Sequence, residues 1–235
     1  MVARLHCLLV LFALAGAAPA VRAQSSPTIV VDPGHPSEVR SGATKFNGTT
    51  EVHIAWVVAE RLARLLRAQG YHVIMTKSAE RSFVSNADRA RVGNRANAAL
   101  VVRLHCDDGS DSGFAIYHAD RTGRVNGHTG PSATVMRSSA AAAESLHVSM
   151  ARMLTGSLKD GGVRGDSRTG IGEGQGALTG SILSEVPVVL IEMVTLSNVH
   201  DASFIKSARG QSLMAQSIAN GIGRYVPASN SPRVR

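Results

Sequence analysis

The sequence predicts a single α/β domain, with a mixed, mostly parallel central sheet and helices on both faces. Two observations support this prediction. Apolar runs alternate with helical patterns along residues 25–226, as they do in chains that build α/β sheets. The run Val186–Met193 is apolar apart from Glu192, which is typical of a central strand that is buried on both faces.

The first 24 of the 235 residues have the pattern of a secretory signal peptide. Arg4 precedes an apolar run from Cys7 to Ala18, and small residues at 18–23 offer cleavage sites. The run is too short for a stable membrane span, although an uncleaved anchor is the alternative. We therefore expect export to the periplasm, cell envelope or exterior, with no stable membrane insertion after cleavage. The remaining chain suits one globular domain at 25–226, followed by a disordered tail at 227–235.

The cysteine content and the net charge indicate a domain without disulfides that binds an anionic partner. Only Cys106 remains after such processing, so the domain has no internal disulfide, and we expect Cys106 to lie in the core. The net charge of +8 falls to +6 without the leader, which suits an anionic polymer such as a cell wall. Nucleic acid is not expected as a partner, because only 4% of the residues are aromatic and no basic cluster contains them.

The first half of the domain contains the clearest elements. Ile29–Val31 forms a strand that runs into a Pro-Gly turn and a polar loop at 36–48. A helix begins at Glu51, with Thr49 or Thr50 as its cap, and Gln69-Gly70 ends it. Its apolar residues have the spacing of one buried face: Ile54, Val57, Val58, Leu62, Leu65 and Leu66.

The same patterns place the later elements. We expect strands at 71–75, 100–105, 114–117 and 186–193, and helices at 86–98, 139–158 and 201–225. Two segments lack periodicity: a flexible connection at 119–138, and a glycine-rich loop at 161–180 that could move over a site.

Four polar residues occupy positions where open α/β sheets place their functional sites. His35, His105 and Glu192 lie at or near the ends of apolar strands, and Glu51 opens a helix. Two imidazoles and one carboxylate are the ligand set of a hydrolytic zinc site, and a further carboxylate is then free to act as a base. For Glu51 alone the simpler explanation is that acidic residues commonly begin helices.

The residues around these positions resemble a known family. V-D-P-G-H at 31–35, A-A-L-V-V-R-L-H at 98–105 and V-P-V-V-L-I-E-M-V-T-L-S-N at 186–198 are similar to the zinc-dependent N-acetylmuramoyl-L-alanine amidases, specifically the catalytic domain of cell-separation amidases and autolysins. N-A-D-R-A-R-V-G-N-R-A-N at 86–97 resembles the arginine- and asparagine-bearing helix of that family. The resemblance spans about residues 27–226.

The resemblance implies a role for each residue. His35, Glu51 and His105 would bind one zinc ion. Glu192 would be the general base that takes a proton from the water that attacks the bond between the muramoyl lactyl group and L-alanine. Peptidoglycan would be the substrate of a monomeric enzyme, with a protein activator as a further possible partner. Asp32 would orient a ligand, or simply cap the turn.

The chain also departs from the family pattern. Pro36 stands where a glycine usually follows the first histidine, and Arg103 replaces the serine of a Ser-Ile-His motif. Arg103 should share a face with His105, so it could pair with Asp32 or Glu192, or meet a peptide-stem carboxylate; a structural ion pair is favoured. A zinc carboxypeptidase of the wall and a non-catalytic wall-binding regulator remain alternatives, and a divalent metal other than zinc remains open.

Overall fold

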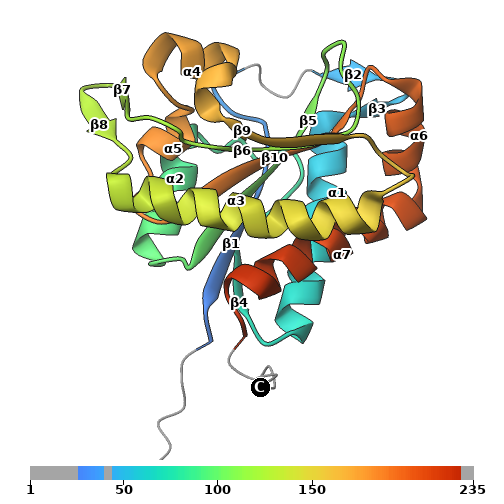
Figure 1. Cartoon of the computed structure of the whole chain (residues 1–235), viewed down its shortest axis with the longest axis horizontal. Coiled ribbons are helices and arrows are strands. Elements are labelled where there is room, and N and C mark those ends of the chain that lie inside the picture. The colour runs from blue at the N-terminus through green and yellow to red at the C-terminus, as the bar shows by residue number, and fades with distance from the viewer. Residues whose placement is uncertain (1–25, 40–43, 229–235) are drawn as a thin grey trace, which may run out of the picture.

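The computed structural model describes residues 26–39 and 44–228, and it confirms the predicted fold class. A six-stranded sheet has the order β4-β1-β5-β10-β6-β9, in which β10 and β6 are antiparallel and the other neighbours are parallel (Figure 1). Its strands are β1 (Thr28–Pro33), β4 (His72–Met75), β5 (Leu100–Asp107), β6 (Phe114–His118), β9 (Asp160–Gly165) and β10 (Val188–Thr195). The predicted signal peptide at 1–24 lies outside the described residues.

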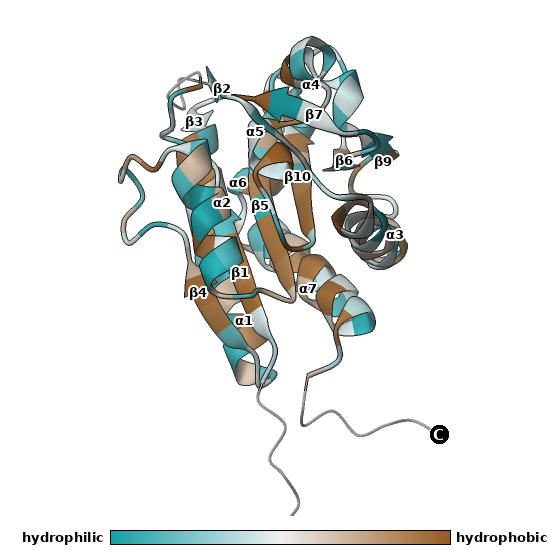
Figure 2. Ribbon diagram, turned by 90° about the vertical axis from the view of Figure 1, so that its left-hand side faces the viewer, coloured by the Kyte–Doolittle hydropathy of each residue, from teal (hydrophilic) through white to brown (hydrophobic). Residues whose placement is uncertain are grey.

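One face of the sheet carries the main hydrophobic core. Helices α1 (Glu51–Ala68), α3 (Ala133–Leu154) and α7 (Ala208–Tyr225) cover this face, and α7 packs between the other two. Alternate strand residues, such as Val102, Leu104 and Ile191, bury their side chains against these helices. Figure 2 shows the hydrophobic colour along the central strands β5 and β10. Cys106 is also buried in this core, as predicted.

The opposite face supports the polar residues. Helices α2 (Asn86–Arg95) and α5 (Thr179–Ile182) lie on this side, and α2 packs over a small cluster that includes Val30, Val101 and Val188. Because strand side chains alternate, the next residues on this face are polar at the carboxyl ends of the strands. The sheet thereby brings Asp32, Arg103, His105 and Glu192 to one edge.

Both segments that were predicted to be irregular contain regular structure. Residues 119–138 form a hairpin of β7 (Gly123–Val125) and β8 (His128–Gly130), followed by the first turns of α3. Residues 161–180 contain most of β9, a 3₁₀ turn η1 (Asp166–Arg168), α4 (Gly170–Gln175) and the start of α5. The predictions failed because these elements are too short to show a period.

The remaining boundaries differ by a few residues. The predicted closing helix is two helices, α6 (Val199–Lys206) and α7, because Ser207 adopts an extended backbone and its side chain accepts from the Gly210 amide, which caps α7. A short hairpin of β2 (Lys45–Phe46) and β3 (Thr49–Thr50) precedes α1. Of the tail predicted at 227–235, Ala228 is buried in the main core, and 229–235 lie outside the described residues. No helix within 26–39 and 44–228 is long and apolar enough to cross a membrane.

The contact between α3 and α7 makes a specific stability prediction. A Cβ added at Gly221 would lie 2.7 Å from the Leu146 Cα, closer than real side chains approach, whereas at Gly223 the nearest atom is the Tyr71 hydroxyl at 3.7 Å. We expect Gly221→Ala to lower the free energy of unfolding by about 1–3 kcal/mol through overpacking. Gly223→Ala should leave it unchanged or raise it by up to about 1 kcal/mol, through helix propensity. Urea denaturation measures both, and equal midpoints for the two variants would contradict the prediction.

Candidate metal centre and catalytic pocket

The turn after β1 places His35 at the carboxyl edge of the sheet. The Gly34 amide donates to the Leu104 carbonyl at 2.9 Å, which holds the turn against β5. His35 then has a positive φ of 47°, a left-handed conformation that few residues other than glycine adopt. This unusual backbone directs the ring towards Glu51, whose Oε2 lies 3.5 Å from His35 Nε2.

Glu51 is fixed at the first turn of α1. The Thr50 side chain caps the helix by accepting from the His53 amide, as predicted. Glu51 Oε1 accepts from the Cys106 amide at 3.2 Å and lies 2.9 Å from His105 Nδ1. The carboxylate is therefore held both by the end of β5 and by the favourable field of a helix N-terminus.

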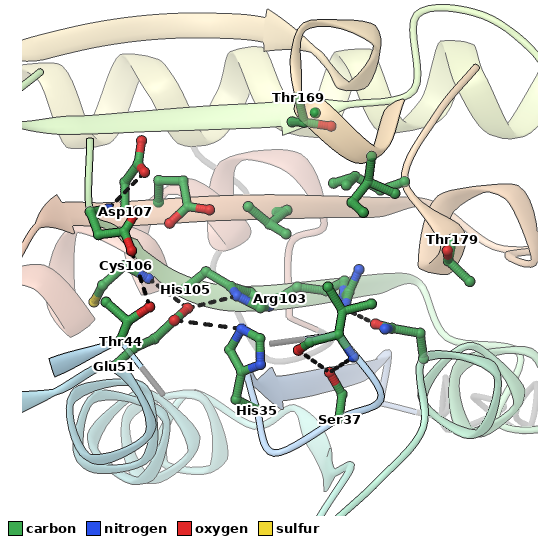
Figure 3. A pocket seen from close by; sticks show the side chains of 18 residues that line it. His35, Ser37, Thr44, Glu51, Arg103, His105, Cys106, Asp107, Thr169 and Thr179 are labelled. Atoms are coloured by element: carbon green, nitrogen blue, oxygen red, sulfur yellow. Dashed lines mark hydrogen bonds and ion pairs between the residues drawn. The ribbon is translucent and has the colours of Figure 1, made fainter. Parts of the chain in front are cut away.

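His35, Glu51 and His105 form a cluster suited to a metal ion. One ligand atom from each residue lies within 4.8 Å of the others, and Figure 3 shows the three side chains pointing towards one another. His35 Nδ1 and His105 Nε2 have no hydrogen-bond partner within the described residues. Two imidazoles and a carboxylate with so few competing partners fit a divalent cation such as zinc.

The protonation states also suit metal binding. Burial is the largest cause that lowers the pKa of His35, to about 4, so its ring is neutral near pH 7. Burial opposes ionisation of Glu51, but the hydrogen bonds that the carboxylate makes with the His105 ring and with the Cys106 amide outweigh it and lower the pKa of the carboxyl. Neutral imidazole and ionised carboxylate are the forms that coordinate metals.

Glu192 lies beside this cluster. Because β10 is parallel to β5, residue 192 is in register with His105, and both side chains line the same pocket. Glu192 Oε2 is buried without a hydrogen-bond partner among the described residues. Burial, followed by the nearby negative charge of Glu51, raises the pKa of Glu192 well above its ordinary value.

Asp32 stabilises the site from beneath, through a buried ion cluster. Its carboxylate is fully buried and accepts hydrogen bonds from Thr76, Arg89 and Arg103. Of the partners expected for Arg103, Asp32 forms the structural ion pair, with Nε and Oδ2 3.0 Å apart. The proximity of Arg89 and Arg103 overcomes the effect of burial and lowers the pKa of Asp32.

Two residues that hold the His35 turn were not predicted from the sequence. Arg89 donates to the carbonyls of Pro33 at 2.7 Å and Pro36 at 3.1 Å, and the Lys77 ammonium donates to the His35 carbonyl. The signal for Arg89 was present, since Asn86, Arg89 and Gly93 have the spacing of one helix face, which is the buried face of α2. Nothing in the sequence around Lys77 predicted its burial.

The pocket above these residues has a volume of about 490 Å³. Its floor contains the residues of β5 and β10 described above, and Glu51 and the His35 turn form one side (Figure 3). Thr169, Gly170 and Ile171 at the start of α4, with Leu178 and Thr179 at the start of α5, form the opposite side. The segment predicted to cover the site therefore does border it, as an ordered wall.

The close packing of Gly34 against His105 generates a prediction. A Cβ at residue 34 would lie 2.7–2.8 Å from three atoms of the His105 ring, so the ring would have to move. We expect Gly34→Ala to weaken zinc affinity about 10- to 100-fold, as changes that reorient a metal ligand typically do. Competition with a chromophoric chelator measures the affinity. Gly174→Ala, where a Cβ meets open space, is the control, and equal affinities for the two variants would contradict the prediction.

Comparison with known proteins identifies the family. The family model described as N-acetylmuramoyl-L-alanine amidase matches residues 29–224. The chain is 24% identical over 199 residues to an N-acetylmuramoyl-L-alanine amidase of Mycobacterium tuberculosis, covering 82% of this chain and 76% of that protein. It is 27% identical over 228 residues to the amidase AmiC of Neisseria meningitidis, covering 86% of this chain but only 53% of that protein.

A solved structure supports the fold assignment. The amidase AmiC2 of Nostoc punctiforme superposes with a TM-score of 0.68 at 22% identity, covering 85% of this chain and 96% of that one. At this identity the likeness concerns the fold. The family match extends over most of the chain, including all the residues of the metal cluster and Glu192. This chain therefore belongs to the N-acetylmuramoyl-L-alanine amidase family of peptidoglycan hydrolases.

Proposed function

We propose that the chain cleaves the amide bond between the lactyl group of N-acetylmuramic acid and L-alanine of the peptidoglycan stem, with one zinc ion held by His35, Glu51 and His105. The observation that carries this proposal is Glu192 Oε2, which is buried without a hydrogen-bond partner among residues 26–39 and 44–228 and lies in one pocket with the ligand cluster. When bound by such a set, zinc lowers the pKa of water to about 7 and polarises a carbonyl oxygen.

Glu192 is the general base in this proposal. Its carboxylate takes a proton from the attacking water and returns the proton to the departing amine of L-alanine. A carboxylate that is already hydrogen-bonded on both oxygens would be a poorer acceptor, and Oε2 of Glu192 has no such partner among the described residues. The burial that raises its pKa also favours proton uptake.

The other residues keep this geometry fixed. Arg89 and Lys77 bind the carbonyls of the His35 turn, so the first imidazole cannot swing away from Glu51. Asp32 orients the ligand only indirectly, through Arg89, because its hydrogen bonds go to the arginines and Thr76. Such fixed ligands reduce the reorganisation required in the transition state.

Two other functions use the same cluster. A zinc carboxypeptidase of the wall would need the same ligands and base, and only the family match favours the muramoyl amide. A non-catalytic wall-binding regulator would not need a buried carboxylate at position 192.

We propose that the chain is exported to the cell envelope and acts as a monomer, with a protein activator as a further partner. Such an activator would bind at the start of α4, which forms part of the pocket wall.

The role of Glu192 is tested by Glu192→Gln. Removing the proton acceptor while keeping the shape should lower kcat by at least about 10²-fold, the scale of general base catalysis. Zinc content, measured by atomic absorption, should stay at one ion per chain. Glu185→Gln, an exposed glutamate before the same strand, is the matched control and should retain full activity. Normal hydrolysis by Glu192→Gln would show that another group is the base.

The substrate bond is tested with purified peptidoglycan. Mass spectrometry after incubation with the zinc-loaded protein should find stem peptides that begin with a free L-alanine amine. Treatment with a chelator should abolish their release, and zinc should restore it. Peptides trimmed at the other end, still joined to muramic acid, would instead identify a carboxypeptidase.

A further inference from the structure

Arg103 combines a structural ion pair with free hydrogen-bonding capacity towards the pocket. Nε donates to Asp32 at 3.0 Å, and Nη2 donates to the Asn86 side-chain oxygen at 2.6 Å. Nη1 has no partner within the described part of the chain, although Arg103 lines the pocket. A guanidinium carries five N–H donors, so three of the five remain available.

Arg103 shares its salt-bridged counter-charge with a second arginine. Asp32 is a single carboxylate that is shared between two buried arginines, Arg89 and Arg103. The Lys77 ammonium is buried nearby, among backbone carbonyls. Asp166 is also within electrostatic reach of Arg103, but burial raises its pKa, which weakens it as a counter-charge. Among the described residues, the carboxylate that forms a salt bridge with Arg103 is also bound to Arg89, while Glu192 attracts Arg103 through space. The free N–H donors of Arg103 can still bind a further anion.

The position of Arg103 along β5 indicates where such an anion would lie. The Cα atoms of residues 103 and 105 lie about 7 Å apart on one strand, and both side chains line the same pocket. In an extended stem whose scissile carbonyl lies at the metal cluster, the next carboxylate follows about 7 Å further along, within the same pocket. Asn86 and Asp32 fix the guanidinium in place, so it is preorganised for such a group.

We propose that Arg103 is a specificity-determining residue that binds a carboxylate of the peptide stem, the α-carboxylate of the isoglutamyl residue that follows L-alanine. This inference rests on the proposed function, because it assumes that the muramoyl amide is held at His105. The donor is Nη1, which can form an ion pair with a carboxylate, whereas the neutral amide of an isoglutaminyl stem offers it only an uncharged carbonyl acceptor. The glycan side of the bond offers no comparable anion.

A pair of soluble muropeptides that differ only in this group tests the proposal. One carries the free carboxylate and the other the amide at the second stem residue, and kcat/KM is measured for both with the zinc-loaded protein. Wild type should prefer the carboxylate by at least about tenfold, the scale of one hydrogen bond to a charged group. Arg103→Met should bring the ratio close to one, and Arg103→Lys, which keeps the charge, should retain part of the preference.

Two controls separate specificity from structure. Arg164→Met removes the same charge from β9, outside the pocket lining, and should leave the ratio unchanged. If Arg103 has only a structural role, Arg103→Met will lower kcat/KM for both substrates together and leave their ratio intact. Zinc content and circular dichroism then show whether the metal site and the fold have been lost. If Arg103→Met does not fold, the ratio for Arg103→Lys decides.

The outcomes are distinct. A wild-type preference that Arg103→Met abolishes supports the proposal. Equal rates for both substrates in wild type, or a preference that survives Arg103→Met, would overturn it while leaving the amidase activity established. Hydrolysis of neither substrate would overturn the proposed function itself, and with it this inference.

Discussion

The buried carboxylate of Asp32 is the interaction on which the site depends. It joins β1, β5 and α2 through Arg103 and Arg89, and Arg89 continues to the carbonyls of the turn that presents His35. A fully buried carboxylate is stable only if its charge is compensated and its oxygens are hydrogen-bonded, which Thr76 and the two arginines achieve. The same contacts that satisfy Asp32 therefore fix the position of a metal ligand.

This ion cluster explains how a basic chain holds a site for a divalent cation. The positive charges lie beneath and beside the pocket floor, whereas Glu51 and Glu192 occupy the region around the two imidazoles. Hydrogen bonds to Asp32 and Asn86 hold the Arg103 guanidinium in place, and it attracts Glu192 through space. The alternation of side chains along β5 places Arg103 and His105 on the pocket face and Cys106 in the core.

Much of this arrangement could be predicted from the sequence. His35, His105 and Glu192 follow apolar strands, and parallel strands bring their carboxyl ends to one edge, so their convergence follows from fold class. Glu51 required the family resemblance, because an acidic residue at a helix start is common. Arg89 was missed because a buried arginine contradicts ordinary burial preferences, and the wall at 166–180 was missed because its helices are too short to show a period.

Cys106 offers an internal probe of opening motions. Its sulfur lies in the main core, while its backbone amide donates to Glu51, so strand β5 connects the thiol directly to the metal cluster. Burial raises the pKa of the thiol well above its ordinary value, which makes it inert while the sheet is closed. The rate at which a thiol reagent labels Cys106 therefore reports how often this part of the sheet opens, and slower labelling with zinc present would give the energetic coupling between the cluster and the core.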